Sequence, residues 1–230
     1  MHSGVTDSGE WDAVQPLLAR EHEVVAPDLP GFGSEPERAG EFSLGDYVLG
    51  TFDGSAALVG TSFGGRAVLE AALAAPERVR KLVLIGANVF DRSEDVQRVQ
   101  QEEVRLFDEG RLDDAAELMA RSWLAGPQRE QNDVDAGLYA RVCAMVKRSY
   151  ELQAGGEGSL KRVEIDLSRI AKPTLVMRGA LDWPDVAAAA ERFVRELPDA
   201  REEVIADCAH LPTMERPDEV ARLVREFLAN

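Results

Sequence analysis

The stretch Gly60–Gly65 (GTSFGG) decides how this chain is organised. It directly follows a short apolar run, Ser55–Val59 (SAALV), and it opens a segment with helical periodicity, Gly65–Ala74. A short apolar run bounded by turn residues is typical of a buried strand, and apolar residues three and four apart are typical of a helix. The sequence therefore predicts a strand, a tight turn centred on Ser62, and a helix that leaves that turn.

The turn has the form G-x-S-x-G, in which a serine sits between a strand and a helix. Gly60 and Gly64 are needed because the strand and the helix nearly touch there, and the tight turn leaves Ser62 strained with its hydroxyl exposed. An ordinary tight turn with a capping serine would show the same letters, but the strand before and the helix after favour a nucleophile. We therefore interpret Ser62 as a candidate catalytic nucleophile.

Further short apolar runs alternate with helical patterns on both sides of this turn. This alternation is typical of a mostly parallel sheet with flanking helices, and near-continuous apolar runs are expected of strands that are covered on both faces. The additional strands are predicted at His22–Pro27, Arg80–Ile85, Thr174–Arg178 and Glu203–Ala206. The additional helices are predicted at Trp11–Arg20, Ala187–Leu197 and Asp218–Leu228.

The alternation stops between about Asn88 and Ile170. That stretch carries no convincing strand, and its periodicity predicts helices over Ser93–Glu109, Leu112–Trp123 and Val134–Leu152. We therefore expect an α/β core formed by residues 1–87 and 171–230, with residues 88–170 as a helical lid inserted between two strands. Such an insert would lie over the carboxyl edge of the sheet, where open α/β folds bind ligands. The polar segment Ser34–Phe42 is predicted to be a loop.

A serine nucleophile needs a base, and the chain offers only three histidines. His210 directly follows the last predicted strand, at the same edge as Ser62. His22 lies at the entry of an early strand, and His2 precedes the predicted sheet. His210 is therefore the candidate base.

The carboxylate that orients such a histidine should also follow a strand. Asp182 comes shortly after Thr174–Arg178, whereas Asp185 and Asp91 remain alternatives. The order serine, aspartate, histidine along the chain is the order of α/β-hydrolases, not that of chymotrypsin or subtilisin.

The composition excludes several classes of partner. The 42 acidic and 26 basic residues give the 230-residue chain a formal net charge of −16, which makes nucleic acid and anionic membranes poor partners. No apolar run is long enough for a membrane span, and the N-terminus lacks the features of a signal peptide. Cys143 and Cys208 do not form a disulfide framework, which favours the cytoplasm. The sequence does not specify an oligomeric state.

The chain resembles the α/β-hydrolase superfamily, specifically its compact, lid-bearing bacterial members. The resemblance covers nearly the whole chain. The residues that carry it are His2–Gly4, Asp28–Gly33 (DLPGFG), the turn at Ser62, Pro76–Val79 (PERV), Gly179–Asp182 (GALD), and His210 with Glu215–Pro217 (ERP). In that family the nucleophile, the acid and the base would fall on Ser62, Asp182 and His210.

The resemblance also implies an oxyanion hole and a reaction without a cofactor. The oxyanion hole would use the backbone N–H of Phe63 and one from the loop after His2, either Gly4 or Val5. His2 is structural in that family. Neither a metal nor a nucleotide is expected, because no Cys/His spacing suggests zinc and Gly31–Gly33 is not a dinucleotide-binding fingerprint.

The family's first strands would precede His2, so we expect a sheet that is incomplete at this end. A strand missing from the middle of the sheet would leave inner edges unpaired. The alternatives are a truncated start, a sheet that closes by pairing His22–Pro27 directly with Ser55–Val59, or a degraded and non-catalytic relative.

The expected partner is a small, mostly apolar acyl compound: an ester, an enol-lactone or a diketone cleaved at a carbon–carbon bond. Trp183, Trp123 and Phe90 are the candidate substrate-binding residues. A haloperoxidase-like perhydrolase and a binding protein that keeps the fold without turnover are the alternatives.

Overall fold

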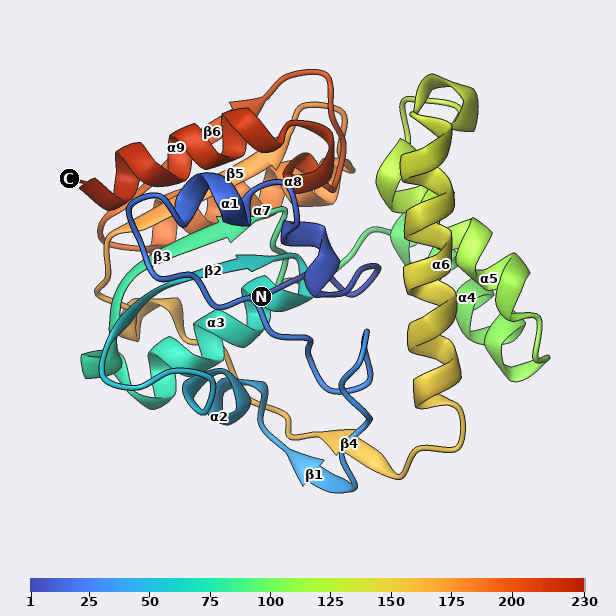
Figure 1. Ribbon diagram of the computed structural model, residues 1–230, viewed down its shortest axis with the longest axis horizontal. Helices are drawn as coiled ribbons and strands as arrows, with labels where there is room; N and C mark the ends of the chain where they lie inside the picture. Colours follow the sequence, from blue (N-terminus) through green and yellow to red (C-terminus); the bar gives the residue numbers. More distant parts are fainter. Residues whose placement is uncertain (230) are drawn as a thin grey trace.

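The computed structural model describes residues 1–229, and its centre is a parallel four-stranded sheet (Figure 1). The strand order is β2-β3-β5-β6, and all three neighbouring pairs are parallel. The strands are β2 (Ala56–Thr61), β3 (Val79–Ile85), β5 (Thr174–Gly179) and β6 (Ala200–Ile205). Four of the predicted strands are thereby confirmed, with boundaries shifted by one to three residues.

The two faces of the sheet bury alternate residues of the same strand. In β3, Leu82 and Leu84 pack into the apolar cluster on one face, whereas Val83 and Ile85 pack into the cluster on the other. Successive side chains of a strand point to opposite faces, so a strand covered on both sides is apolar throughout. This explains why Leu82–Ile85 of β3 is a continuous apolar run.

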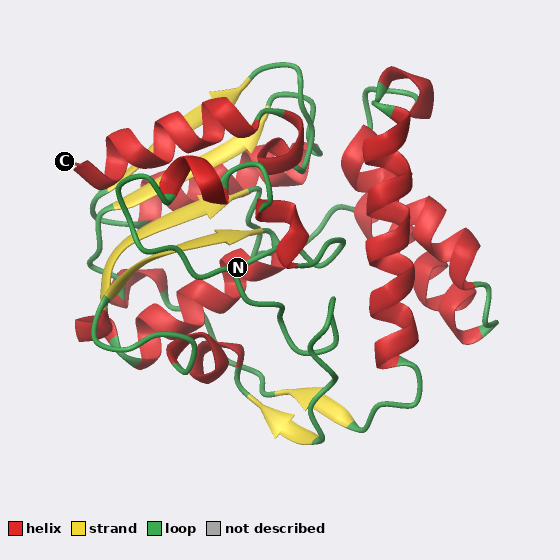
Figure 2. Cartoon of the chain, viewed as in Figure 1, coloured by secondary structure: helices red, strands yellow, loops and turns green. Residues whose placement is uncertain are grey.

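Helices cover both faces of the sheet (Figures 1 and 2). One face packs against α2 (Leu44–Leu49), α3 (Phe63–Ala74) and α7 (Pro184–Glu196). The other packs against α1 (Gln15–Leu18) and α9 (Pro217–Ala229). The chain is thus a three-layer α/β/α structure, as the sequence predicts.

The segment between β3 and β5 forms a separate helical group, at the right of Figure 1. It consists of α4 (Glu94–Asp108), α5 (Leu112–Met119) and α6 (Ala136–Gln153), which share an apolar cluster of their own. Val5 and Leu211 from the sheet side join that cluster, so the helical group packs on the loops at one end of the sheet. After α5 the chain widens into a π-helix over Ala120–Ala125.

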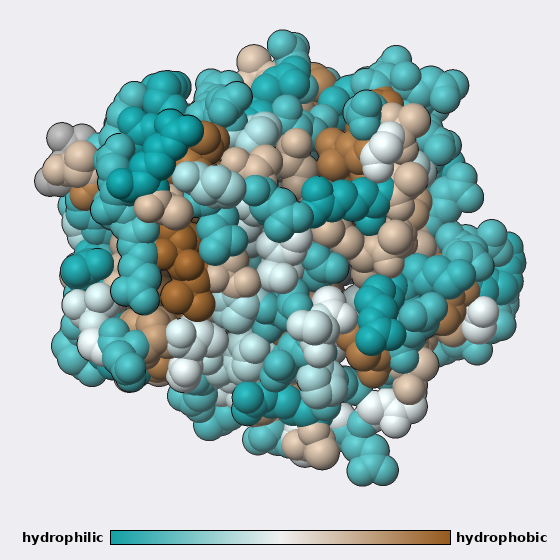
Figure 3. Space-filling model, viewed as in Figure 1, coloured by the Kyte–Doolittle hydropathy of each residue, from teal (hydrophilic) through white to brown (hydrophobic). Residues whose placement is uncertain are grey.

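The remaining helical elements are short. They are α8 (Pro212–Glu215) and 3-10 turns at Ser8–Trp11, Pro76–Arg78, Gln131–Asp133 and Leu167–Arg169. No helix within residues 1–229 is long and apolar enough to cross a bilayer. The face in Figure 3 is mostly hydrophilic with scattered apolar patches.

The strand predicted at His22–Pro27 is wrong, and so is its direct pairing with Ser55–Val59. Residues 23–29 have no regular secondary structure, and the Val25 side chain is 56% exposed. A strand forms only by hydrogen bonding to a neighbour, and none of the described strands pairs with this segment. The free edge of β2 pairs with Met1 instead: Thr61 N donates to Met1 O at 2.9 Å, and the Met1 ammonium donates to Val59 O at 2.5 Å.

Three further differences from the sequence prediction are local. The segment read as a loop contains β1 (Gly40–Phe42), and the stretch read as free of strands contains β4 (Gly158–Leu160); the two pair in parallel. Three-residue strands are too short to give a period-two pattern. The helix predicted at Trp11–Arg20 shrinks to α1, because Pro16 has no N–H to donate to the preceding turn.

Gly60→Ala is expected to destabilise the fold by crowding β2 against α3. A Cβ on Gly60 would lie 2.3 Å from the carbonyl oxygen of Gly64, a backbone atom that cannot swing away. Overpacking of this kind costs about 1–3 kcal/mol of unfolding free energy, and we expect a correspondingly lower urea midpoint.

The matched control is Gly137→Ala in α6, where the nearest atom to a new Cβ is a carboxylate oxygen of Asp135 at 3.2 Å. Alanine is the better helix former, so this variant should be as stable as the parent chain or more stable by up to about 1 kcal/mol. Equal urea midpoints for Gly60→Ala and the parent chain would contradict the close approach of strand and helix.

Candidate active site

Ser62 sits in a strained turn between β2 and α3. Its φ of 50° and ψ of −109° place a non-glycine residue in sparsely populated backbone space. Its backbone N–H donates to Ile85 O at 2.8 Å, which fixes the turn to the end of β3. A Cβ on Gly64 would lie 2.4 Å from Met1 O, so the turn tolerates no side chain there. The half-buried Ser62 side chain makes no capping hydrogen bond to its own helix.

His210 and Asp182 form a buried pair on the loops that follow β6 and β5. His210 Nδ1 lies 2.8 Å from Asp182 Oδ2, and both side chains are almost fully buried. The other carboxylate oxygen accepts the N–H of Trp183 at 2.8 Å, which holds the carboxylate in place. A carboxylate at Nδ1 keeps the proton on that nitrogen, so Nε2 is left as a proton acceptor.

The alternative acids lie elsewhere. Asp185 Oδ2 accepts the backbone N–H of Ser93 at 2.6 Å, and Asp91 is exposed in the loop before α4. Among the three candidate carboxylates, Asp182 is therefore the one that the fold places against His210.

The loop that carries His210 is held from both sides. Its backbone N–H donates to Trp123 O at 3.2 Å, and the Trp123 and His210 ring centroids are 4.5 Å apart. The carboxylate of Glu215 accepts the N–H of Ala209 at 2.9 Å and pairs with Arg129 at 2.7 Å. This network orients the imidazole, and it gives Glu215 of the ERP sequence a structural role.

Gly4 and Phe63 line the same cavity as Ser62. Within residues 1–229, neither the amide of Gly4 nor that of Phe63 has a hydrogen-bond acceptor, and the two residues lie in close contact. The amide of Val5, the sequence-based alternative, donates to Ser3 Oγ at 3.2 Å. Gly4 and Phe63 are therefore the pair of donors that this geometry leaves available to an oxyanion.

His2 is engaged on both ring nitrogens. Leu29 N donates to Nε2 at 2.8 Å, so Nδ1 carries the proton and donates to Ser3 O at 2.7 Å. Burial lowers the pKa of His2, so the ring is neutral. It has no free nitrogen with which to act as a base.

A buried carboxylate that sequence reasoning missed, Glu10, anchors the loop that carries Gly4. Glu10 accepts the N–H of Ser3 at 2.8 Å and the hydroxyls of Thr6 and Thr213 at 2.5 and 2.8 Å. It ties this loop to α8, two residues beyond His210. Glu10 is one of 42 acidic residues, and no local pattern distinguishes it.

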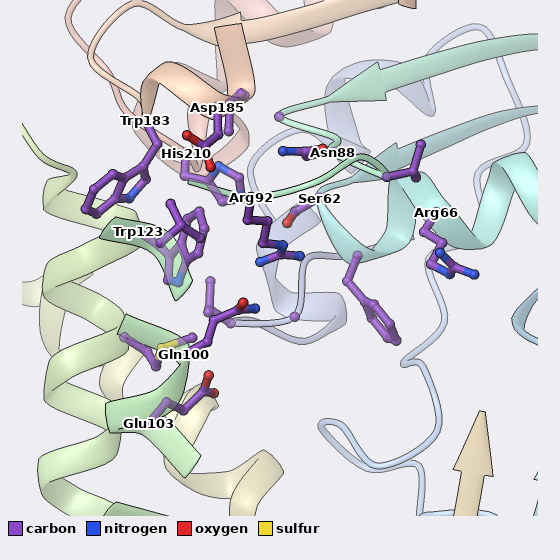
Figure 4. Close-up of a pocket in the computed structure, with 18 of the residues that line it drawn as sticks. Ser62, Arg66, Asn88, Arg92, Gln100, Glu103, Trp123, Trp183, Asp185 and His210 are labelled. Atoms are coloured by element: carbon purple, nitrogen blue, oxygen red, sulfur yellow. The ribbon is translucent and has the colours of Figure 1, made fainter. Parts of the chain in front are cut away.

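Ser62, His210, Gly4 and Phe63 line one cavity of about 420 Å³. Ser62 and His210 are labelled in Figure 4. The predicted residues Trp183, Trp123 and Phe90 line the cavity too, and the helical group supplies one wall. The polar lining residues of the cavity are Arg66, Asn88, Arg92, Gln100, Glu103 and Asp185, and of these the sequence indicates only Asp185 as a site residue, as an alternative acid. Their individual positions give no motif, because they are spread over three elements and a loop.

Cys208 lies two residues from His210 but is not a competing nucleophile. Burial raises the pKa of its thiol to about 12, and its Sγ contacts Ile205 O at 3.5 Å. A thiol with that pKa stays protonated near neutral pH.

Comparison with known proteins agrees with this fold. Residues 1–223 match the model of a family described as "Alpha/beta hydrolase family". The chain is 30% identical to a 2-hydroxymuconate semialdehyde hydrolase of Pseudomonas sp. strain CF600, over 98% of this chain and 83% of the relative. It is 26% identical to a pimeloyl-[acyl-carrier protein] methyl ester esterase of Nitrosomonas europaea, over 95% and 90%. The enol-lactonase structure from Burkholderia xenovorans LB400 superposes with a TM-score of 0.82 at 19% identity, covering 100% of this chain and 89% of that one.

Proposed function

This chain belongs to the alpha/beta hydrolase family, and from that premise we propose that it is a serine hydrolase acting through Ser62, His210 and Asp182. The observation that carries the proposal is the buried 2.8 Å contact between Asp182 and His210, because His210 also lines the cavity that contains the strained Ser62. A nucleophile, a base and an orienting carboxylate on three separate loops at one sheet edge are the constellation that acyl transfer needs.

In this mechanism His210 Nε2 takes the proton of the Ser62 hydroxyl while Oγ attacks the acyl carbon of the substrate. Asp182 stabilises the imidazolium that forms. The N–H groups of Phe63 and Gly4 donate to the oxyanion of the tetrahedral intermediate. His210 then protonates the leaving group, and a water molecule activated by the same imidazole releases the acyl group from Ser62.

The cavity supports a small and largely apolar substrate. Its volume of about 420 Å³ suits a small molecule, and Trp183, Trp123 and Phe90 supply apolar surface. The α4 and α5 helices contribute residues to the wall opposite Ser62, so we assign the helical segment of residues 88–170 the role of a lid. The named relatives cleave an ester and a semialdehyde, and we accordingly propose ester, enol-lactone or carbon–carbon hydrolysis here.

A fluorophosphonate probe tests the proposal. The folded chain should react at a single serine, identified as Ser62 by mass spectrometry, and it should hydrolyse p-nitrophenyl butyrate. The control is the same protein unfolded in urea, which should not be labelled, because activation depends on His210 being folded against the serine. A folded chain that neither reacts nor hydrolyses the ester would indicate a binding protein that keeps the hydrolase fold.

A further inference from the structure

Arg92 is the cavity residue that the proposed mechanism does not use. It lies in the loop between β3 and α4, and it lines the same cavity as Ser62 and His210. Figure 4 shows its side chain extending into the open space in front of Ser62. The guanidinium is therefore placed beside the reacting centre rather than in solvent.

Within residues 1–229, the Arg92 guanidinium has neither a hydrogen bond nor an ion pair. Arg66, the other arginine of the cavity, is engaged in both ways: Nε lies 2.9 Å from Glu70 Oε1, and Nη2 donates to Val163 O at 2.8 Å. Burial lowers the pKa of Arg92, yet an arginine remains charged in proteins. The guanidinium is half-buried, and its five N–H donors are available to bind an anion that enters the cavity.

The two carboxylates whose charges act on Arg92, Asp185 and Glu103, are hydrogen-bonded to other groups. Asp185 accepts the backbone N–H of Ser93 at 2.6 Å. Glu103 accepts the hydroxyl of Tyr150 at 2.7 Å, and burial raises the pKa of Glu103. Both carboxylates raise the pKa of Arg92 by Coulombic attraction, but neither forms a hydrogen bond or an ion pair with it.

The loop holds Arg92 in position from both sides. On one side, Asn88 Oδ1 accepts the N–H of Phe90 at 2.8 Å, and the Phe90 ring packs on Phe193 at 5.1 Å between centroids. On the other, the backbone N–H of Ser93 donates to Asp185 at the N-terminus of α7. The Arg92 carbonyl accepts a hydrogen bond from Gln97 Nε2 at 2.6 Å. Such anchoring fixes the backbone from which the Arg92 side chain extends, so less of the loop has to be ordered when a ligand binds.

We propose that Arg92 binds a carboxylate carried by the substrate at a point remote from the scissile acyl carbon. The inference rests on the proposed function, and it narrows the substrate class to acid-bearing acyl compounds. A guanidinium matches a carboxylate with two parallel N–H···O bonds. The chain has a net charge of −16 and therefore repels anions overall. A cation inside the cavity provides a local site at which an anionic substrate binds despite that overall repulsion.

Matched ester substrates test this assignment. The probes are mono-p-nitrophenyl esters of the dicarboxylic acids from succinate to suberate, each compared with the neutral p-nitrophenyl ester of equal chain length. The parent chain should favour at least one of the acid-bearing esters in kcat/KM. Arg92→Gln should lower that preference by about 10- to 100-fold, the range for a hydrogen bond to a charged group. Arg92→Lys should retain part of the preference, since lysine keeps the positive charge but lacks the two parallel N–H donors of the guanidinium.

The matched control is Arg98→Gln on α4, which removes the same charge from an exposed side chain paired with Asp95. It should leave the preference unchanged. A parent chain that treats all acid-bearing and neutral esters alike would overturn the assignment. So would an Arg92→Gln variant that loses both activities equally.

Binding without turnover separates this inference from the proposed function. Adipate should raise the melting temperature of the parent chain and of Arg98→Gln but not of Arg92→Gln, and neutral adipamide should raise none of the three. Adipate binding that depends on Arg92, in a chain that hydrolyses no ester, would leave the carboxylate site standing and refute the hydrolase. Ester hydrolysis with no effect of adipate on the melting temperature and no preference for acid-bearing esters would support the hydrolase and refute the carboxylate site.

Discussion

Ser62→Ala is expected to lower kcat for a p-nitrophenyl ester by about 10⁴- to 10⁶-fold, the range seen when the nucleophile of a serine triad is removed. Without Oγ no acyl-enzyme forms, and only the oxyanion donors and substrate binding remain to accelerate attack by water. The variant should fold normally, because the Ser62 side chain makes no capping bond and alanine meets the same backbone strain as serine.

The control for this variant is Thr61→Val, one residue earlier. The Thr61 hydroxyl is buried without a hydrogen-bond partner, so replacing it with a methyl group removes an unsatisfied polar atom. Thr61→Val should keep kcat within a few-fold and the urea midpoint at or above that of the parent chain. Residual activity of Ser62→Ala within 10-fold of the parent chain would refute Ser62 as the nucleophile.

Asp182→Asn is expected to lower kcat about 10⁴-fold with little change in the fold. An asparagine keeps the shape of the aspartate, but it can turn an N–H toward His210 Nδ1. The imidazole proton then moves to Nε2, which can no longer accept the proton of Ser62. Steady-state kinetics with p-nitrophenyl butyrate, together with a urea midpoint, measures the effect and separates it from unfolding.

Asp185→Asn is the matched control, since it makes the same change three residues along. Asp185 holds the backbone of Ser93 and contacts neither His210 nor Ser62 through a hydrogen bond. We expect a loss below 10-fold, arising from a looser loop. A larger loss for Asp185→Asn than for Asp182→Asn would transfer the role of the acid to Asp185.

The sequence predicts most of the sheet because the buried strands can be recognised from their own apolar residues. In β3 the side chains from Leu82 to Ile85 are buried, and in β5 those from Thr174 to Met177 are buried, so the apolar run is visible without knowledge of the neighbours. His22–Pro27 has a similar composition, but its status as a strand depends on a partner that the described chain does not place beside it. Pairing is a property of two segments, and composition reports on only one.

The candidate site likewise has a part that the local sequence determines and a part that depends on tertiary structure. The turn at Ser62 is local, because glycines on both sides and a strand-to-helix junction force its backbone, and the sequence alone determined it. The choice of Asp182 over Asp185, the anchoring by Glu10 and the placement of Arg92 beside Ser62 depended on tertiary structure. Each joins residues far apart along the chain, and only the packing of the helices and loops around the sheet sets the distances between them.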